Sequence, residues 1–255
     1  MRGMSQLSLA LAADVSARHV GFLEVGRARP SRAMVLALAQ TLEVPLRERN
    51  QLLVAAGFAP VYKETPLTDA SLEPVSQALD FMLSASELHP CFIVNRRYDV
   101  VMANHTGRWL LETFAEDSTL ASVGCNMVRL LTEPRGMRPY VGNRGDLLRK
   151  VLGRVRRDLG QLHRRDERDE TTLALAEAAW AELPAPTRSE VPLSPMIGLQ
   201  LRRGDLSLAL FTTIATLGTP LDVTLQEIRV ETLFPSDDAT RRVLARVSAT
   251  GGAEA

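Results

Sequence analysis

A set of small and polar side chains near the start of the chain has the character of a surface that contacts nucleic acid. An arginine can pair bidentately with guanine and a small methyl side chain can touch a thymine methyl, whereas amides, hydroxyls and further arginines hold phosphates. We therefore expect Arg18 and Ala17 to read bases, and Gln6 and Ser16 to hold phosphates at helix N-termini. The small and polar residues in question are Ser5, Gln6, Ser16, Ala17, Arg18, His19, Gly21, Arg27 and Arg29.

Two short helices joined by a tight turn would position these side chains. Ser5 is suited to cap the first helix, whose apolar residues up to Ala13 recur at helical spacing. Ser16 is suited to cap the second helix, which ends at Gly26. Asp14 lies at the turn between them, where its side chain supports a left-handed backbone.

These two helices resemble the lambda-repressor-like helix-turn-helix of XRE-type regulators. The positions that carry the resemblance are Gln6, Leu9, Ala10, Val15, Ser16, Val20, Leu23, Glu24, Gly26, Arg29 and Pro30. Asp14 departs from the glycine that such motifs most often have at the turn. The resemblance implies that the second helix lies in the major groove of double-stranded DNA while the first crosses the backbone. It also implies that the nine small and polar residues named above are the DNA contacts. An ordinary helical hairpin in a protein-interaction module is the alternative.

Length and composition are those of an ordinary soluble protein with room for two modest domains. The chain has 255 residues, of which 45% are hydrophobic and 24% charged. Its formal net charge of zero argues against a wholly basic nucleic-acid-binding protein. Residues 1–62 nevertheless hold seven arginines against four carboxylates, a difference of three positive charges. Because this excess is modest, we expect a homodimer that contacts two half-sites.

Cysteine use and hydropathy indicate a reduced, cytoplasmic setting. The two cysteines, Cys91 and Cys125, have no partners at metal-ligand spacing. No run approaches eighteen apolar residues, and no charged-then-apolar leader opens the chain. We therefore expect neither a membrane span nor a signal peptide.

We divide the chain into a helix-turn-helix domain at 1–57, a linker at 58–73, a larger domain at 74–248 and a flexible tail at 249–255. Two further helices, starting near Pro30 and Pro45, complete the small bundle. Related domains have a helix before the motif, and that first helix is apparently missing here. We therefore expect an uncovered apolar patch at Leu7, Leu11 and Leu36, or its coverage by another chain.

The larger domain combines an antiparallel sheet of about five strands with helices, so the fold class is α+β. Residues 74–87 form an amphipathic helix that joins the domains or serves a dimer interface. A hairpin at 91–103 with a polar tip, and strands at 196–202, 206–217 and 223–234, supply the sheet. We expect helices that begin at Asn104, at Asn126 and at Ser236, and a longer helical region over 145–183. A solvated charge run at 163–170 interrupts this longer region, and a proline-rich connector follows it at 184–195.

Two strands, intervening helices and three further strands follow the order of a PAS-like sensor fold. The whole chain resembles the MmyB-like regulators, in which an XRE-type helix-turn-helix precedes a PAS-like ligand-binding domain. The resemblance rests on residues 27–32, 55–60, 95–101, 136–139 and 217–225. It implies a ligand-responsive, sequence-specific transcription regulator that senses a small apolar molecule, with fatty acids as a candidate class.

A pocket for such a ligand should be apolar, with a few polar groups that orient the molecule. We expect its walls among Phe92, Val94, Met102, Leu110, Met127, Leu130, Leu131, Phe211 and Leu217, each of which could equally be plain core. Arg138 and Tyr140, near a loop that could cover the pocket, are the predicted partners of an acidic head group. No cofactor is certain, and a bound fatty acid or similar lipid is the candidate occupant.

Other classes of function have weaker support in the sequence. His89, His105 and His163 lack the spacing of a nucleophilic or metal site, so we expect neither an enzyme nor a metal centre. A haem or redox sensor that uses His89 or His105 stays open, as does a protein-interaction adaptor with an inactive helix-turn-helix.

Overall fold

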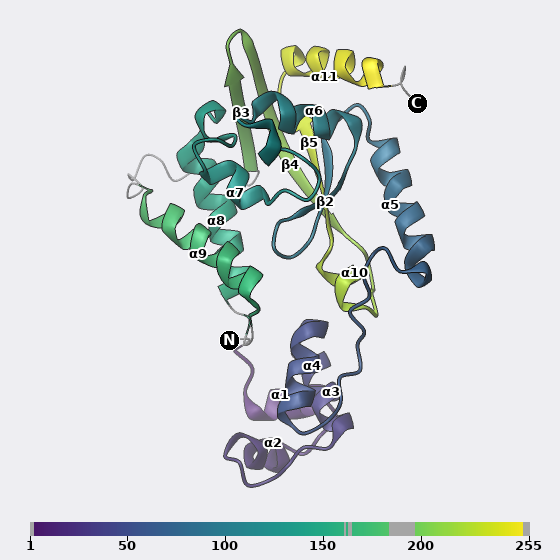
Figure 1. Cartoon of the computed structure of the whole chain (residues 1–255). Helices are drawn as coiled ribbons and strands as arrows, with labels where there is room; N and C mark the ends of the chain where they lie inside the picture. Colours follow the sequence, from purple (N-terminus) through teal and green to yellow (C-terminus); the bar gives the residue numbers. More distant parts are fainter. Residues whose placement is uncertain (1–2, 161, 163–164, 184–196, 252–255) are drawn as a thin grey trace. The chain divides into compact units, whose positions relative to one another are not determined.

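The computed structural model describes residues 3–160, 162, 165–183 and 197–251 (Figure 1). The chain divides into two compact units. The first unit comprises Met1–Pro66 together with Gly218–Gln226, and the second comprises Leu67–Leu217 together with Glu227–Ala255. The predicted connector at 184–195 and His163 lie outside the described residues.

The first unit is built on four short helices, as predicted: α1 (Gln6–Ala12), α2 (Ala17–Glu24), α3 (Arg32–Thr41) and α4 (Leu46–Ala55). Their shared core consists of Ala10, Val20, Val35, Ala39, Leu46 and Leu53. Ser5 caps α1 by accepting a hydrogen bond from the backbone N–H of Ser8. Asp14 has the expected left-handed backbone, with φ 52°. Ser16 precedes α2 without a side-chain capping bond, so only its position agrees with the prediction.

An apolar patch is exposed on α1, as expected. Leu7 is 61% exposed and Leu11 is 75% exposed. Leu52 on α4 is also 42% exposed, because the buried face of this short helix is taken by Leu46 and Leu53. Among the described residues, the bundle therefore leaves apolar surface on two of its helices.

Chain segments beyond α4 complete the first unit. Asn50 holds the segment after α4 by donating to the carbonyl of Tyr62 at 2.7 Å and accepting from its backbone N–H at 3.1 Å. The segment 218–226 adds further bonds. Gln226 Oε1 accepts from Leu46 N at 2.6 Å, Asp222 Oδ2 accepts from Thr65 Oγ1 at 2.6 Å, and Lys63 O accepts from Val223 N at 2.8 Å. The unit is therefore assembled from two stretches that are far apart in the sequence.

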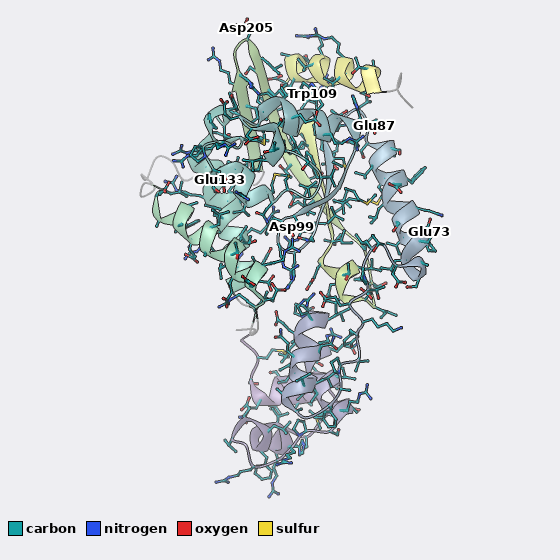
Figure 2. The ribbon with its side chains drawn as sticks, viewed as in Figure 1. Glu73, Glu87, Asp99, Trp109, Glu133 and Asp205 are labelled. Carbon is teal, nitrogen blue, oxygen red and sulfur yellow. The ribbon has the colours of Figure 1, made fainter. Side chains whose placement is uncertain are left out.

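The second unit contains a five-stranded sheet whose neighbouring strands are all antiparallel, which confirms the predicted α+β class. The strands are β1 (Cys91–Val94), β2 (Val100–Ala103), β3 (Ile197–Arg203), β4 (Leu206–Thr216) and β5 (Arg229–Pro235), in the order β2-β1-β5-β4-β3. Asp205 lies in the turn of the long β3–β4 hairpin (Figure 2).

The helical elements of this unit are η1 (Ala70–Leu72), α5 (Glu73–Ala85), α6 (His105–Phe114), η2 (Ser118–Leu120), α7 (Met127–Thr132), η3 (Arg138–Tyr140), α8 (Arg144–Gly160), α9 (Glu167–Ala181) and α11 (Asp238–Gly251). Helices α6, α7 and α8 pack on the sheet and form the main core with it. Helices α7 to α9 and helix α5 lie on opposite sides of the sheet in Figure 1.

Asn104 fixes the junction of β1, β2 and α6. Its Oδ1 accepts from Gly107 N at 2.8 Å, which caps α6, and from Cys91 N at 3.0 Å. Its Nδ2 donates to the carbonyl of His89 at 2.9 Å. A Cβ at Gly107 would come within 2.9 Å of the Cys91 carbonyl, so this close approach requires glycine. The cap predicted from the sequence therefore also anchors the edge of the sheet.

Three predictions about the second unit and its neighbours were wrong in detail. The predicted strand at 223–234 begins only at Arg229, because α10 (Val223–Glu227) occupies its first part, with Asp222 accepting from Thr224 N at 2.8 Å. Helix α11 is capped by Asp237 rather than Ser236, since Asp237 Oδ1 accepts from Thr240 N at 2.7 Å. The same helix continues to Gly251, so residues 249–251 are helical.

The described part of the charge run is exposed as predicted except at Asp169, and two residues of the hairpin tip, Arg96 and Tyr98, are also buried. Asp169, within the charge run, is only 1% exposed and accepts hydrogen bonds from Arg96 Nη2 at 2.7 Å and Arg97 Nε at 2.8 Å. Tyr98, in the predicted polar tip of the hairpin, is 1% exposed with φ 67°. Ion pairing lets the hairpin tip pack against α9 instead of facing water.

Candidate functional site

The predicted DNA contacts lie on α1, on α2 and in the turn that follows α2. Ser5, Gln6, Ser16, Arg18, Arg27 and Arg29 are exposed, whereas Ala17, His19 and Gly21 are half-buried. The guanidinium of Arg18 lies 5.2 Å from the centre of the Phe22 ring, one turn along the same helix. The start of α2 therefore presents one arginine held against an aromatic face, with the uncapped hydroxyl of Ser16 beside it.

Gln6 and Gly21 join α1 to α2. The amide of Gln6 donates a hydrogen bond to the carboxylate of Glu24 at the end of α2. A Cβ on Gly21 would lie 3.4 Å from Gln6 Oε1. Gly21 thus gives the Gln6 side chain room to cross to the second helix, which is a packing role in addition to its predicted place at the DNA surface.

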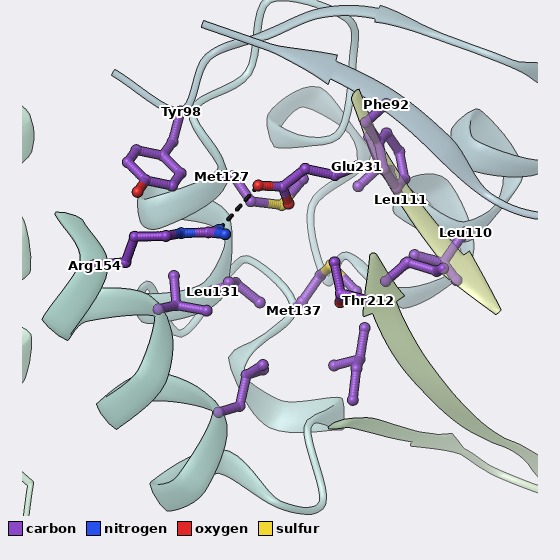
Figure 3. A pocket seen from close by; sticks show the side chains of 14 residues that line it. Phe92, Tyr98, Leu110, Leu111, Met127, Leu131, Met137, Arg154, Thr212 and Glu231 are labelled. Carbon is purple, nitrogen blue, oxygen red and sulfur yellow. Dashed lines mark hydrogen bonds and ion pairs between the residues drawn. The ribbon is translucent and has the colours of Figure 1, made fainter. Parts of the chain in front are cut away.

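A cavity of about 60 Å³ lies inside the second unit, between the sheet and helices α6, α7 and α8 (Figure 3). Its walls are Phe92, Tyr98, Leu110, Leu111, Met127, Leu131, Met137, Leu147, Val151, Arg154, Leu199, Thr212, Glu231 and Leu233. Most of this lining is apolar, and the polar groups come from only four side chains. This is the composition of a site that holds an apolar body and orients it at one end.

Four of the predicted wall residues line this cavity: Phe92, Leu110, Met127 and Leu131. Val94 and Leu130 are buried in the surrounding core, and Met102 and Leu217 are half-buried outside the cavity. Phe211 stacks on Phe234 with 5.6 Å between ring centres, and it too lies outside the lining.

The two residues predicted to hold a head group lie elsewhere. Arg138 donates to the carbonyl of Thr132 at 3.3 Å and forms an ion pair with Glu182 at 3.5 Å. Tyr140 donates to Glu116, and the guanidinium of Arg203 lies 4.8 Å from its ring centre. Neither side chain lines the cavity, since both are held by these other partners.

An ion pair that we did not predict occupies the polar end of the cavity. Arg154 Nη2 donates to Glu231 Oε1 at 2.9 Å, and the two side chains are only 16% and 13% exposed (Figure 3). Among the described residues, neither Nε nor Nη1 of Arg154 has a hydrogen-bond partner, although both atoms are buried. A buried guanidinium that still has unpaired hydrogen-bond donors therefore lines an apolar cavity.

Sequence spacing holds a signal for this pair. Arg154 follows the cavity residues Leu147 and Val151 by seven and three positions, which places all three on one helical face. Glu231 precedes Leu233 by two positions on β5, so both point to the same side of the sheet. The signal in the sequence is therefore that Arg154 and Glu231 each lie on the otherwise apolar face of their helix or strand.

Tyr98 connects the ion pair to a second charged pair. Its ring lies 5.3 Å from the Arg154 guanidinium and 5.2 Å from that of Arg229, and its hydroxyl donates to Asp158 at 2.8 Å. Arg229 also donates to Asp158, at 2.7 Å. Burial raises the pKa of Tyr98 to about 12, so the phenol stays neutral near pH 7.

Within the described residues, the cysteines are buried or half-buried and His89 packs against an aromatic ring. No cluster of three or more histidine, cysteine, aspartate or glutamate side chains that could hold a metal exists in the described parts of the chain. Burial lowers the pKa of His89, whose ring lies 4.7 Å from that of Phe234. Burial raises the pKa of Cys91 and raises that of Cys125 to about 11, so neither thiol is activated. No described helix is long and apolar enough to span a membrane.

Two family models match most of the chain. Residues 75–247 match the family described as "MmyB-like transcription regulator ligand binding domain", and residues 1–49 match the family described as "Helix-turn-helix". A comparison with curated proteins found no match. A solved structure titled "Structure of an RNA-binding Light-Oxygen-Voltage Receptor" aligns at 12% identity with a TM-score of 0.29, covering 98% of this chain and 62% of that one.

Proposed function

The chain belongs to the MmyB-like transcription regulators, and we propose that its ligand is a small, largely apolar acid whose head group binds Arg154. A helix-turn-helix and a ligand-binding domain on one chain make it a ligand-responsive DNA-binding regulator. A fatty acid or similar lipid is the candidate occupant of the cavity. We further propose that the regulator acts in the cytoplasm, as a homodimer on double-stranded DNA.

The observation that carries this proposal is the buried guanidinium of Arg154. A buried N–H without a partner costs roughly 1–3 kcal/mol, and a carboxylate can satisfy two such groups with a pair of charge-assisted hydrogen bonds. The remaining lining, with Leu110, Leu131 and Val151 among its members, is suited to an apolar body. A molecule with a carboxylate at one end and a hydrocarbon chain at the other matches both features.

The volume of the cavity implies that ligand binding widens it. Sites for drug-sized molecules have volumes of roughly 300–1,000 Å³, whereas this cavity has about 60 Å³. Met127 and Met137 are the residues best suited to move, since a methionine side chain has three rotatable bonds and repacks readily. Left empty, a cavity of this size costs about 1.4 kcal/mol of folding free energy at 24 cal/mol per Å³.

Ligand binding can change DNA affinity only if the ligand prefers one state of the protein over another. Glu231 lines the cavity, and Gln226, five residues earlier in the chain, caps α4 of the first unit. A head group that competes with Glu231 for Arg154 would shift the start of β5. We propose that this short connection, together with α5, carries the ligand's effect to the DNA-binding helices.

Two measurements on the full-length protein test the proposed function. Native mass spectrometry of the purified protein should detect a co-purifying carboxylic acid with a long apolar chain. Fluorescence anisotropy with DNA from upstream of its own gene should show that Arg18→Ala abolishes sequence-specific binding. Arg241→Ala, which removes an exposed arginine from α11, is the matched control and should bind normally.

Two results would contradict the proposal. A protein that stays free of acidic lipid and fails to bind added fatty acids would refute the ligand class. Salt-sensitive, sequence-specific binding that is unchanged in Arg18→Ala would place the DNA readout on another surface.

A further inference from the structure

The charged side chains at the polar end of the cavity and next to it balance one another. Arg154 pairs with Glu231 at 2.9 Å, and Arg229 pairs with Asp158 at 2.7 Å (Figure 3 shows the first pair). The ring of Tyr98 lies against both guanidiniums, and burial raises the pKa of its phenol to about 12, so Tyr98 adds no charge near pH 7. These five residues are called the charge cluster below, and their net charge is zero.

Glu231 has uncharged neighbours apart from this cluster. Its cross-strand neighbours are Phe92 on β1 and Ile214 on β4. In the cavity lining, the polar side chain from β4 is the neutral Thr212, and Arg154 is the other charged residue. Because the Glu231 side chain is only 13% exposed, solvent screens its charge weakly. A charge that a ligand brings into the cavity therefore acts strongly on Glu231.

The charge cluster has unpaired hydrogen-bond donors but no unpaired positive charge. Arg154 Nε and Nη1 and Arg229 Nη1 are buried, and none of the three has a hydrogen-bond partner among the described residues. A carboxylate that accepts from Arg154 brings a third negative charge to two positive ones. Moving Glu231 from Arg154 towards Arg229 does not change this count. Since a neighbouring like charge disfavours ionisation, one carboxyl group of the complex should become neutral.

Glu231 is the carboxylate of the cluster best placed to become neutral. Asp158 accepts from the Tyr98 hydroxyl at 2.8 Å and from Arg229 at 2.7 Å, and two such bonds favour its charged form. Among the described residues, Arg154 Nη2 is the one donor to the Glu231 side chain, and a ligand carboxylate competes for that same guanidinium. A protonated Glu231 can instead donate its O–H to the ligand carboxylate, which is a strong charge-assisted hydrogen bond.

We propose that the acid enters the cavity together with one proton, which Glu231 takes up from the solvent. The complex then keeps a net charge of zero, because the two guanidiniums face Asp158 and the ligand carboxylate while Glu231 is neutral. The inference rests on the proposed function, since it requires an acidic ligand whose head group binds Arg154. It makes Glu231 a specificity-determining residue that couples recognition of the acid to pH.

Isothermal titration calorimetry of the full-length protein with decanoate counts this proton. Titrations at pH 7 in two buffers with different ionisation enthalpies should show uptake of about one proton for each decanoate bound, because the buffer supplies it. The affinity for decanoate should accordingly fall about tenfold for each unit that the pH rises between about 6 and 8. Decanol brings no charge, so it should bind without proton uptake and with an affinity that does not depend on pH.

A variant assigns the proton to its acceptor. Glu231→Gln keeps the size of the side chain but removes the carboxylate, so decanoate should bind without proton uptake and with an affinity that is the same at each pH. At about pH 8 this variant should bind decanoate at least tenfold more tightly than the unmodified protein does. Glu177→Gln is the matched control, because Glu177 pairs with Arg156 of α8 at 2.8 Å outside the cavity, and it should keep both the uptake and the pH dependence.

The same titrations separate this inference from the proposed function. Decanoate that binds the unmodified protein without proton uptake would overturn the inference and leave the proposed ligand class intact. Full uptake in Glu231→Gln would also overturn it, because another group would then take the proton. A protein that binds no decanoate in either buffer would refute the ligand class, and the inference with it.

Discussion

Replacing Arg154 by leucine is the sharpest test of the polar end of the cavity. The substitution leaves Glu231, which is 13% exposed, without its cation. Breaking a buried pair by removing one partner costs about 3–5 kcal/mol, and the residual exposure of both side chains moves the expected loss to about 2–3 kcal/mol. For a domain of this size, that loss lowers the melting temperature by about 5–10 °C.

The double variant Arg154→Leu with Glu231→Leu should regain most of this stability, because it replaces the pair with apolar groups that suit the rest of the lining. Tryptophan fluorescence is the natural probe, since Trp109 on α6 and Trp180 on α9 are the only tryptophans of the chain and both belong to the second unit. The thermal transition therefore reports this unit without a contribution from the other.

Ligand selectivity is the second readout of the same variants. Loss of the charge-assisted hydrogen bonds from Arg154 should weaken binding of decanoate by about 1.5–3 kcal/mol, or roughly 10–100-fold, with little change for decanol. Arg138→Leu, at the position that we first expected to hold the head group, should alter neither affinity. Unchanged decanoate binding in Arg154→Leu, or a preference for the acid in the double variant, would refute the assignment of Arg154.

Three further predictions concern the cavity, the phenol beside it and the first unit. Val151→Phe should fill the cavity and weaken decanoate binding at least tenfold, while the free energy of unfolding changes by less than about 1 kcal/mol. Val155→Phe is the control, because Val155 lies one helical turn further along and outside the cavity, and it should destabilise the unit by about 1–3 kcal/mol. The pKa of Tyr98 is raised to about 12, so the folded state binds more protons than the unfolded state between pH 10 and 12. The free energy of unfolding should therefore fall by about 2–3 kcal/mol across this pH window, and by less in the Tyr98→Phe variant. Urea titrations at several pH values would measure this difference. Gln226→Ala should lower the stability of the first unit by about 1 kcal/mol, because Pro45 gives α4 no side-chain cap and Gln226 supplies one from a distant part of the chain. Hydrogen exchange of the Leu46 amide would measure this loss.

Local signals in the sequence predicted most of the helices and strands. Ser5 and Asn104 cap the helices that they were expected to cap, because a capping bond joins residues two or three positions apart. Asn126 caps the short helix that we expected to begin there. The prediction failed at residues 223–227, where alternation of apolar and polar residues is compatible with a strand. A local capping bond to Asp222 and a hydrogen bond from Val223 N to the carbonyl of Lys63, more than 150 positions away, favour a helix there, and only the first has a local signal.

The candidate site was harder to predict than the fold. Apolar walls such as Phe92 and Leu131 could be named because burial follows from residue type and periodicity. Arg154 and Glu231 were missed because a charged residue is ordinarily expected to be exposed, and only their pairing across 77 positions makes burial tolerable. Tyr98 was hidden in a segment whose neighbours are polar, and its burial depends on ion pairs made with α9.

The composition of the first unit from two distant stretches bears on how the protein matures during translation. The ribosome makes residues 1–66 first and residues 218–226 only after the whole of 67–217. Until then, the backbone N–H of Leu46 and the hydroxyl of Thr65 hydrogen-bond to water instead of to Gln226 and Asp222. The DNA-binding helices of a nascent chain therefore lack their last supports until most of the sensor has been synthesised. An interrupted or truncated product should accordingly be a poor competitor for the operator.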